Sequence, residues 1–233
     1  MTMLNDFLPT SATWGVLLTL AAFALGTFIN RKTGKAIFNP LLLGTVFVIV
    51  FLSVCSIPYE DYKASASPVS YLLLPATVSL AVPLYEKWDL LRKNVLAIVM
   101  GILAGTLASL GSVLVLALLL KLDHSQYIKL LPKSVTTAIS MDVSHELGGI
   151  AALTGAIVIL TGILGALMAE TVCKVCHITH PIARGIGIGT AAHAVGTSKA
   201  LQMGEVEGAM SGLAVAVAGV MTAILCPIFS SFV

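Results

Sequence analysis

The sequence predicts an all-α polytopic membrane protein with two inverted repeats, about six membrane spans and two broken or re-entrant elements. The chain has 233 residues, of which 58% are hydrophobic and only 10% charged, and its mean hydropathy is +1.00. A soluble domain is about 25% charged, so this chain is expected in a membrane. Long charge-free stretches recur along it, and two segments interrupt the pattern with proline or glycine.

Eight segments make up this pattern. A spanning helix needs about 20 apolar residues, and six charge-free segments are that long: Phe7–Asn30, Ala36–Tyr59, Ala64–Tyr85, Asn94–Leu120, Leu147–Ala169 and Gly208–Val233. Two weaker segments, Lys121–Ser144 and Ile178–Lys199, complete the set. No basic stretch or small-residue cleavage site marks a signal peptide, so the first segment is expected to stay in the protein.

The segments repeat at a fixed offset. The first four start at residues 7, 36, 64 and 94, and the last four at 121, 150, 178 and 208, which is 114 residues later in each case. We therefore expect one membrane domain with one repeat at residues 7–120 and a second at 121–233, as in many secondary transporters.

The third element of each repeat is broken. In the first repeat, Pro75 and Pro83 each lack an N–H and obstruct a continuous helix. In the second, Gly185–Lys199 holds four glycines, each costing a helix about 1 kcal/mol relative to alanine. Freed backbone groups at membrane depth are tolerated where they line a cavity, so the two breaks predict a transport site.

The distribution of Lys and Arg between the two sides of the membrane favours a topology in which the two broken elements are re-entrant. If all eight segments cross, the two sides hold seven and six Lys or Arg residues. If the third and seventh re-enter, the contrast becomes nine against four, which the positive-inside rule prefers, with both termini outside. The nine are Arg31, Lys32, Lys35, Lys121, Lys129, Lys133, Lys174, Arg184 and Lys199.

A second polar intrusion begins at Pro132. Lys133, Ser134, Thr136 and Thr137 follow it directly. A helix N-terminus beside a lysine attracts anions, so this segment is interpreted as an anion-binding half-helix. The alternative is a loop-to-helix junction with ordinary capping.

Two ionisable residues lie in the glycine-rich break. His193 is a candidate proton carrier or substrate ligand, or it hydrogen-bonds a freed carbonyl and holds the break in shape. Lys199 either neutralises a carboxylate or extends to the membrane interface.

The motif Cys173-Lys-Val-Cys176-His177 has the form of a haem attachment or zinc site. Nothing else supports either group, so no metal is expected. Cys55 and Cys226 sit in apolar spans and are interpreted as small buried hydrophobes.

Other function classes are disfavoured. Asp142, His145 and Glu146 could form a gate or proton relay, but a polar segment end is the commoner explanation. No catalytic triad order, nucleotide loop or paired-carboxylate spacing is present, so an enzyme is not expected. The net charge of +2 gives no nucleic-acid footprint.

Five motifs occur in order along the chain: Asn39-Pro-Leu-Leu, Pro75–Tyr85, Pro132–Thr137, Pro181–Gly185 and Gly189–Thr197. In these motifs the chain closely resembles the LrgB/CidB family, and the resemblance runs from Asn39 almost to the end of the chain. The resemblance implies an antiholin-like protein that acts with an LrgA or CidA partner on murein hydrolase activity and cell lysis. Relatives include bacterial pyruvate carriers and plastid glycolate/glycerate translocators, so it also implies small monocarboxylates as cargo. Leu74 and Ala138 depart from the family pattern, replacing a common glycine and a common proline.

Together with this resemblance, which implies the cargo class, the sequence favours a monocarboxylate transporter of the bacterial inner membrane that works by alternating access, as a homo-oligomer. Proton or sodium coupling and an LrgA-type partner are both compatible with it, and no other cofactor is expected. The alternative is a regulator of lysis without cargo. The expected substrate-binding residues are Asn39, Pro75, Ala76, Thr77, Pro83, Lys133, Ser134, Thr136, Thr137, Gly189, Thr190, His193, Gly196, Thr197 and Lys199.

Overall fold

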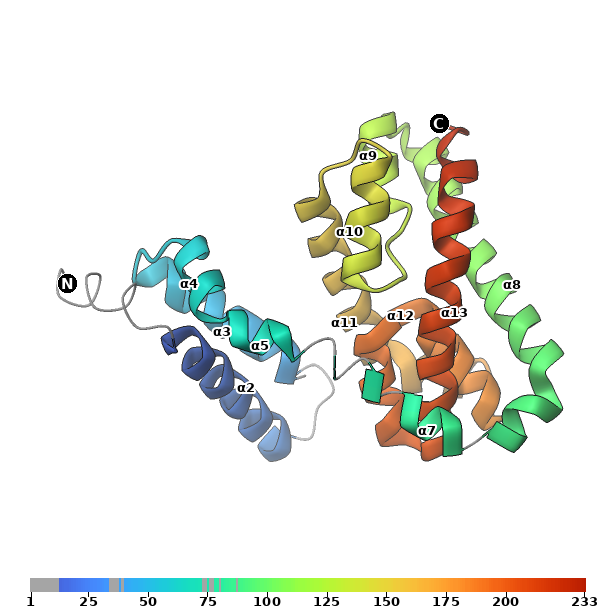
Figure 1. The fold of residues 1–233 in the computed structure, drawn as a ribbon, viewed down its shortest axis with the longest axis horizontal. Coiled ribbons are helices and arrows are strands. Elements are labelled where there is room, and N and C mark those ends of the chain that lie inside the picture. The colour runs from blue at the N-terminus through green and yellow to red at the C-terminus, as the bar shows by residue number, and fades with distance from the viewer. Residues whose placement is uncertain are drawn as a thin grey trace. The chain divides into compact units, whose positions relative to one another are not determined.

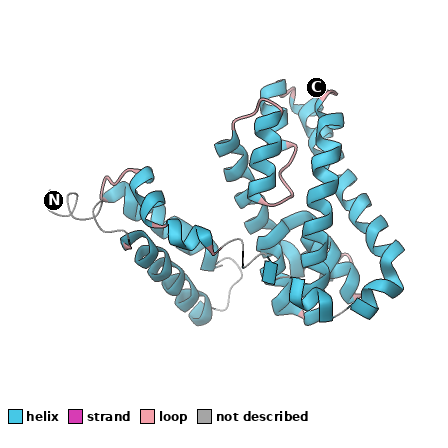
Figure 2. Cartoon of the chain, in the orientation of Figure 1, coloured by secondary structure: helices cyan, strands magenta, loops and turns pink. Residues whose placement is uncertain are grey.

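A computed structural model describes residues 13–33, 38, 40–72, 75, 78–79, 81–86 and 88–233. All regular structure in these residues is helical (Figures 1 and 2). The chain forms two compact units, residues 1–79 and 80–233. The first contains α2 (Trp14–Thr33), α3 (Pro40–Val54), α4 (Tyr59–Ser65) and α5 (Ser67–Tyr71). The second contains α7 (Ala81–Glu86), α8 (Trp88–Leu120), α9 (His124–Leu130), α10 (Thr137–Glu146), α11 (Ala151–Val175), α12 (Pro181–Met203) and α13 (Glu205–Ser230).

Four described helices are long and apolar enough to cross a membrane. They are α2, α11, α13 and the Leu91–Leu120 part of α8, while α3 is apolar but shorter. Many of their large apolar side chains are exposed, as expected for helices that face lipid. The predicted all-helical membrane class is confirmed, whereas six spans and the inverted repeat stay predictions. The boundary between the compact units, at residue 79, does not coincide with the expected repeat boundary at residue 120.

In the first unit, α2 packs against α3 and α4 through small residues. A Cβ on Gly26 would lie 2.7 Å from the carbonyl oxygen of Pro40, so only glycine allows this approach. At the other end of α2, Thr19 Oγ1 lies 2.8 Å from Tyr62 Oη. The unit is therefore a tight helical hairpin closed by α4.

In the second unit, two cores lie at opposite ends of α8 and α13. One core joins Ile98 and Ile102 of α8 to Ile186 of α12 and Met210 of α13. The other is formed by residues of α8, α9, α10 and α13, including Leu110, Tyr127, Val143 and Cys226. Each end of α8 and α13 thus packs against a different segment, α12 at one end and α9–α10 at the other (Figure 1).

The segment α9–α10 folds back on itself. Its loop, residues 131–136, is closed by Ser140, whose Oγ donates to the carbonyl of Pro132 at 2.6 Å. Its two ends meet again, because a Cβ on Gly149 would lie 3.5 Å from Ile128 Cγ1. Tyr127 Oη donates to the carbonyl of Phe229 at 2.9 Å, which places the base of this hairpin at the C-terminal end of α13.

Helix α12 also folds back, at His193. A Cβ on Gly196 would lie 3.0 Å from Ile188 Cγ2, although residues eight apart in a straight helix are about 12 Å apart. The two limbs return to the same place: Arg184 of the first contacts Glu207, and Leu201 of the second packs against Gly208. The base of this hairpin therefore lies at the N-terminal end of α13. The interruption expected in the glycine-rich segment is present.

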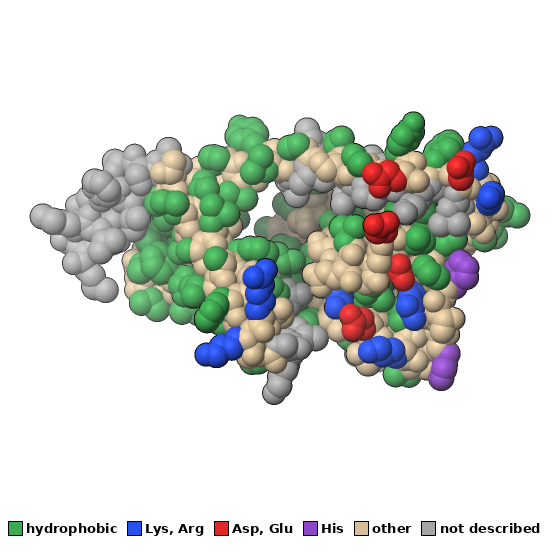
Figure 3. All heavy atoms as spheres, turned by 90° about the horizontal axis from the view of Figure 1, so that it is seen from below, with side chains coloured by type: hydrophobic (Ala, Val, Ile, Leu, Met, Phe, Trp, Pro, Cys, Tyr) green, Lys and Arg blue, Asp and Glu red, His purple; other side chains and the backbone are tan. Residues whose placement is uncertain are grey.

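These two hairpins correct the expected topology. The segment Lys121–Ser144 was expected to cross the bundle, but it returns to the end where it began because its limbs are short and joined by a sharp loop. Lys121 and Lys129 consequently lie at the opposite end of the second unit from Lys174 and Arg184. The charge count that grouped these residues on one side was therefore wrong. Figure 3 looks onto the end that holds the base of α12, where basic, acidic and histidine side chains gather.

Candidate functional site

A pocket of about 320 Å³ lies where the tips of the two hairpins meet the middle of α8. The loop between α9 and α10 contributes Lys133 and Ser134, and the first limb of α12 contributes Ile186, Gly187, Thr190 and Ala191. The wall is α8, through Gly101, Gly105, Ala108, Ser109 and Ser112. The volume lies within the roughly 300–1,000 Å³ range of small-molecule sites.

Lys133 is the charged group of this pocket. It is half-buried, and its Nζ donates to Ser134 Oγ at 3.0 Å and to Ser109 Oγ at 3.3 Å. Ser109 Oγ in turn donates to Ser134 Oγ at 2.8 Å. Within the described part of the chain, no carboxylate pairs with Lys133. Among the described residues, its ammonium group is therefore bonded only to neutral hydroxyl groups.

This triangle leaves hydrogen-bond donors available. An ammonium group has three N–H donors, and Lys133 uses two of them on the serines. Ser134 Oγ accepts from both Lys133 and Ser109, so its own proton is free to donate. A carboxylate in the pocket could accept from the ammonium and from this hydroxyl together, and charge-assisted bonds of this kind are the strong ones.

The α12 hairpin supplies space rather than charge. Gly187 and Ala191, one turn apart, form its exposed face in the pocket. A Cβ on Gly105 of α8 would lie 2.8 Å from Thr190 Cγ2, so glycine allows the limb to approach the wall. The hydroxyl of Thr190 lines the pocket but donates to its own helix, to the carbonyl of Ile186 at 2.8 Å.

His193 forms the break of α12 and does not line the pocket. Its φ of 42° lies in the region that favours glycine, and its side chain is only 2% exposed. Nε2 lies 3.0 Å from the carbonyl oxygen of Val158 in α11. Gly162 accommodates the ring, because a Cβ there would lie 2.6 Å from Nε2. The geometry matches the structural alternative for this histidine, and a role in transport stays a prediction.

The residues around the break also contact neighbouring helices. Thr197 Oγ1 donates to the carbonyl of His193 at 3.1 Å and lies 2.8 Å from Ser211 Oγ of α13. Lys199 forms an ion pair with Glu170 of α11 at 2.6 Å, which is a protein partner rather than a substrate. None of these side chains lines the pocket.

The glycines of this segment have separate roles. A Cβ on Gly189 would overlap the carbonyl oxygen of Ser211, so Gly189 permits the close crossing of α12 and α13, as small residues do in membrane bundles. Gly196 permits the second limb to lie against Ile188 of the first. Neither lines the pocket.

The other expected site residues are distributed as follows. Thr136 and Thr137 start α10 and do not line the pocket, and a Cβ on Gly155 would lie 3.5 Å from the Thr137 methyl group. Pro75 and Pro83 belong to different compact units, so the structure does not test whether they meet. The remaining three, Asn39, Ala76 and Thr77, lie outside the described residues.

The sequence matches a known family over nearly its full length. A model described as the LrgB-like family matches residues 19–232. The chain belongs to this family. Similar proteins include the antiholin-like protein LrgB of Bacillus mycoides, Bacillus cereus and Bacillus anthracis. Each is 36% identical over 221 residues, which cover 94% of this chain and 96% of the relative. No solved structure matches this chain.

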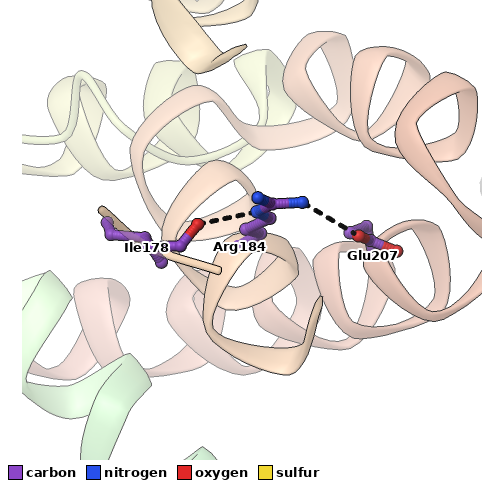
Figure 4. Close-up of polar contacts among 3 residues, drawn as sticks. All are labelled: Ile178, Arg184 and Glu207. Carbon is purple, nitrogen blue, oxygen red and sulfur yellow. Dashed lines mark hydrogen bonds and ion pairs between the residues drawn. The ribbon is translucent and has the colours of Figure 1, made fainter. Parts of the chain in front are cut away.

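In this LrgB-like chain, Arg184 fastens the base of the α12 hairpin (Figure 4). Its Nε donates to the carbonyl of Ile178 at 2.7 Å, and one terminal nitrogen lies 3.9 Å from a carboxylate oxygen of Glu207, which is 7% exposed. The arginine thereby ties the α11–α12 loop to the first turn of α13, consistent with its place in the Pro181–Gly185 motif.

The cysteines of the LrgB-like chain are free thiols. Cys173 and Cys226 are buried, Cys55 is half-buried and Cys176 is exposed. Among the described residues, no three His, Cys, Asp or Glu side chains gather in a way that could hold a metal ion. Cys55 was expected to be a buried hydrophobe and is less buried than that.

The sequence reasoning missed the wall that α8 contributes. Gly101, Gly105 and Ser109 follow one another at four-residue spacing, with Ser112 three residues on, so they lie on one face of the helix. Such a stripe of small residues in an apolar span marks a close approach by another helix. That signal was available, but it does not reveal that Lys133 is the neighbour.

Proposed function

We propose that this LrgB-like chain is a secondary transporter of small monocarboxylates, and that the cargo's carboxylate binds at Lys133 between the two hairpin tips. The observation that carries the proposal is a half-buried lysine in a pocket, surrounded by hydroxyls and without a carboxylate partner among the described residues. A charge held away from water needs a counter-ion, and an anionic cargo would supply it.

The arrangement of the hairpins supports transport rather than simple storage of an anion. They enter from opposite ends of α13, and broken helices that meet in the middle of a bundle are typical of transporter sites. In this mechanism, Lys133 and Ser134 hold the carboxylate, and movement of one hairpin or helix group against the rest opens the pocket to each side in turn. Proton or sodium coupling, an LrgA-type partner and homo-oligomers are compatible with it.

The test is uptake of labelled pyruvate, glycolate and lactate into proteoliposomes that contain the purified chain. Saturable uptake is expected from the natural chain. Lys133→Met removes the cation and should lower uptake about tenfold or more, because the hydrogen bond that the ammonium group donates to the cargo is lost, and a bond to a charged group contributes about 1.5–3 kcal/mol. The thermal midpoint should not fall, because the methionine fills similar space.

The matched control is Lys129→Met, which removes the same charge one turn earlier, outside the pocket. It should transport as the natural chain does. Equal loss in both variants would indicate a general charge effect and contradict the assignment of Lys133. No uptake by the chain alone, followed by uptake with an LrgA-type partner, would make it one subunit of a carrier.

A second candidate function is favoured by the names of the relatives, which are called antiholin-like. In that case the chain would regulate a partner's pore or murein hydrolase activity without cargo. Absence of uptake with and without the partner, together with a change in the partner's membrane leakage when this chain is present, would support this function instead.

A further inference from the structure

The pocket is longer than a three-carbon acid requires. Contacts along α8 give its order: Ser109 faces Ser134, Gly105 faces Thr190, and a Cβ on Gly101 would lie 3.7 Å from Ile186 Cγ2. Gly101 and Ser109 are eight residues apart in a regular part of α8, so the pocket extends about 12 Å along the helix. A pyruvate molecule whose carboxylate is bound at Lys133 would leave the part of the pocket near Gly101 empty.

The two ends of the pocket differ in chemistry. The Lys133 end has the ammonium group and the serine hydroxyls. The far end is lined by Gly101, Ile186 and Gly187, none of which has a polar side chain, while Thr190 and Ala191 lie between the two ends, level with Gly105. A site that is charged at one end and apolar at the other fits an acid with a hydrocarbon tail.

Gly187 controls the space at the far end. It is exposed, it lines the pocket, and a Cβ added to it would meet no atom within 4 Å. Its missing side chain therefore relieves no clash with a neighbouring helix, in contrast to Gly189 two residues later, where a Cβ would overlap α13. The glycine keeps room open inside the pocket.

We propose that the cargo class extends to unbranched aliphatic monocarboxylates of up to about six carbons, with Gly187 as the residue that sets the length limit. This inference rests on the proposed function, because it takes Lys133 as the carboxylate site. The tail of the acid would lie along α8 toward Ile186, where burial of each CH₂ group contributes about 0.8 kcal/mol.

The experiment compares hexanoate and unlabelled pyruvate as inhibitors of labelled pyruvate uptake, without a pH gradient. The quantity measured is the half-inhibitory concentration of hexanoate divided by that of pyruvate, so a higher ratio means weaker binding of hexanoate. In the natural chain, hexanoate should inhibit at least as well as pyruvate. Gly187→Leu should raise the ratio about tenfold or more, since misfit of a few methylene groups changes selectivity by about 10–200-fold. Ala191→Leu, at the same face, should act in the same direction.

The matched control is Gly111→Leu. Gly111 lies in α8 outside the pocket, and a Cβ there also meets no atom within 4 Å. The ratio should stay at its natural value, and any effect of the fatty acid on the vesicles will be the same in this variant. Pyruvate uptake without inhibition by hexanoate, or an unchanged ratio in Gly187→Leu and Ala191→Leu, would overturn the inference and leave the proposed function standing.

A second measurement separates the two proposals if no cargo is transported. Hexanoate should raise the thermal midpoint of the purified natural chain and of Gly111→Leu, because a ligand that binds the folded state stabilises it. It should not raise that of Gly187→Leu. Stabilisation with this pattern would show that the pocket binds the acid although the chain does not transport it. If the chain shows neither transport nor this stabilisation, both proposals are contradicted.

Discussion

The two hairpins of the second unit differ in how they break and in what they bring to the pocket. The α9–α10 hairpin turns through a six-residue loop, residues 131–136, and places a lysine and a serine in the pocket. The α12 hairpin turns at one residue, His193, and contributes an isoleucine and small residues. Its more polar groups, His193, Thr197 and Lys199, bond to α11 and α13.

This contrast shows that a broken helix and a binding residue are separate requirements. A break leaves backbone groups that need partners, and a tight break satisfies them with its own side chains and its neighbours. A longer loop satisfies more of them internally, which leaves a side chain such as Lys133 for a ligand. We expect substitutions in α12 to affect stability first and those at Lys133 to affect transport first.

The largest effect on stability is expected for Gly189→Leu. The new side chain would overlap the carbonyl of Ser211 and approach Ala214, so α12 and α13 must separate. Overpacking typically costs about 1–3 kcal/mol, and a clash with a backbone atom, which cannot change rotamer, places this variant at or above the upper end of that range. Thermal unfolding in detergent, followed by circular dichroism, measures it. Gly187→Leu is the control, and equal midpoints for the two variants would contradict the packing described for this limb.

An intermediate effect is expected for His193→Ala. This substitution removes the hydrogen bond between the ring and the Val158 carbonyl, and such a bond contributes about 0.5–1.5 kcal/mol. It also leaves a cavity beside Gly162, which adds to the cost. His193→Gly loses the same contacts but adopts positive φ without strain, so it should be about 1 kcal/mol more stable than His193→Ala. Natural stability in His193→Ala combined with lost uptake would instead indicate a direct role in transport.

The smallest effect is expected for Lys199→Met. Its ion pair with Glu170 is short, but the two side chains are 28% and 45% exposed, and such pairs contribute about 0–1 kcal/mol. Unfolding should shift by less than about 1 kcal/mol, and Glu170→Gln should give a similar shift. A loss of uptake as large as that of Lys133→Met would show that this lysine also acts on the cargo.

The sequence predicted the two segments that meet at the pocket, but only a few of the residues that line it. Lys133, Ser134 and Thr190 were expected and do line the pocket. Ser109 and Ser112 were not expected. The sequence of an apolar span does not distinguish a serine that hydrogen-bonds to its own helix from one that faces a lysine. Residues such as Thr197 and Gly189 were expected in the site because they share its segment, but helical periodicity turns them toward α13.

The sequence by itself determined the membrane class, the place of the break in the glycine-rich segment, and the lysine in a polar intrusion. These follow from local properties, namely apolar length, the helix cost of glycine and the exclusion of charge from lipid. Only the tertiary structure decided that Lys121–Ser144 folds back, that α8 forms the wall of the pocket, and that His193 bonds to Val158. Hydropathy predicts that a segment is buried away from water, but it does not predict whether lipid or another helix contacts it, because both are apolar.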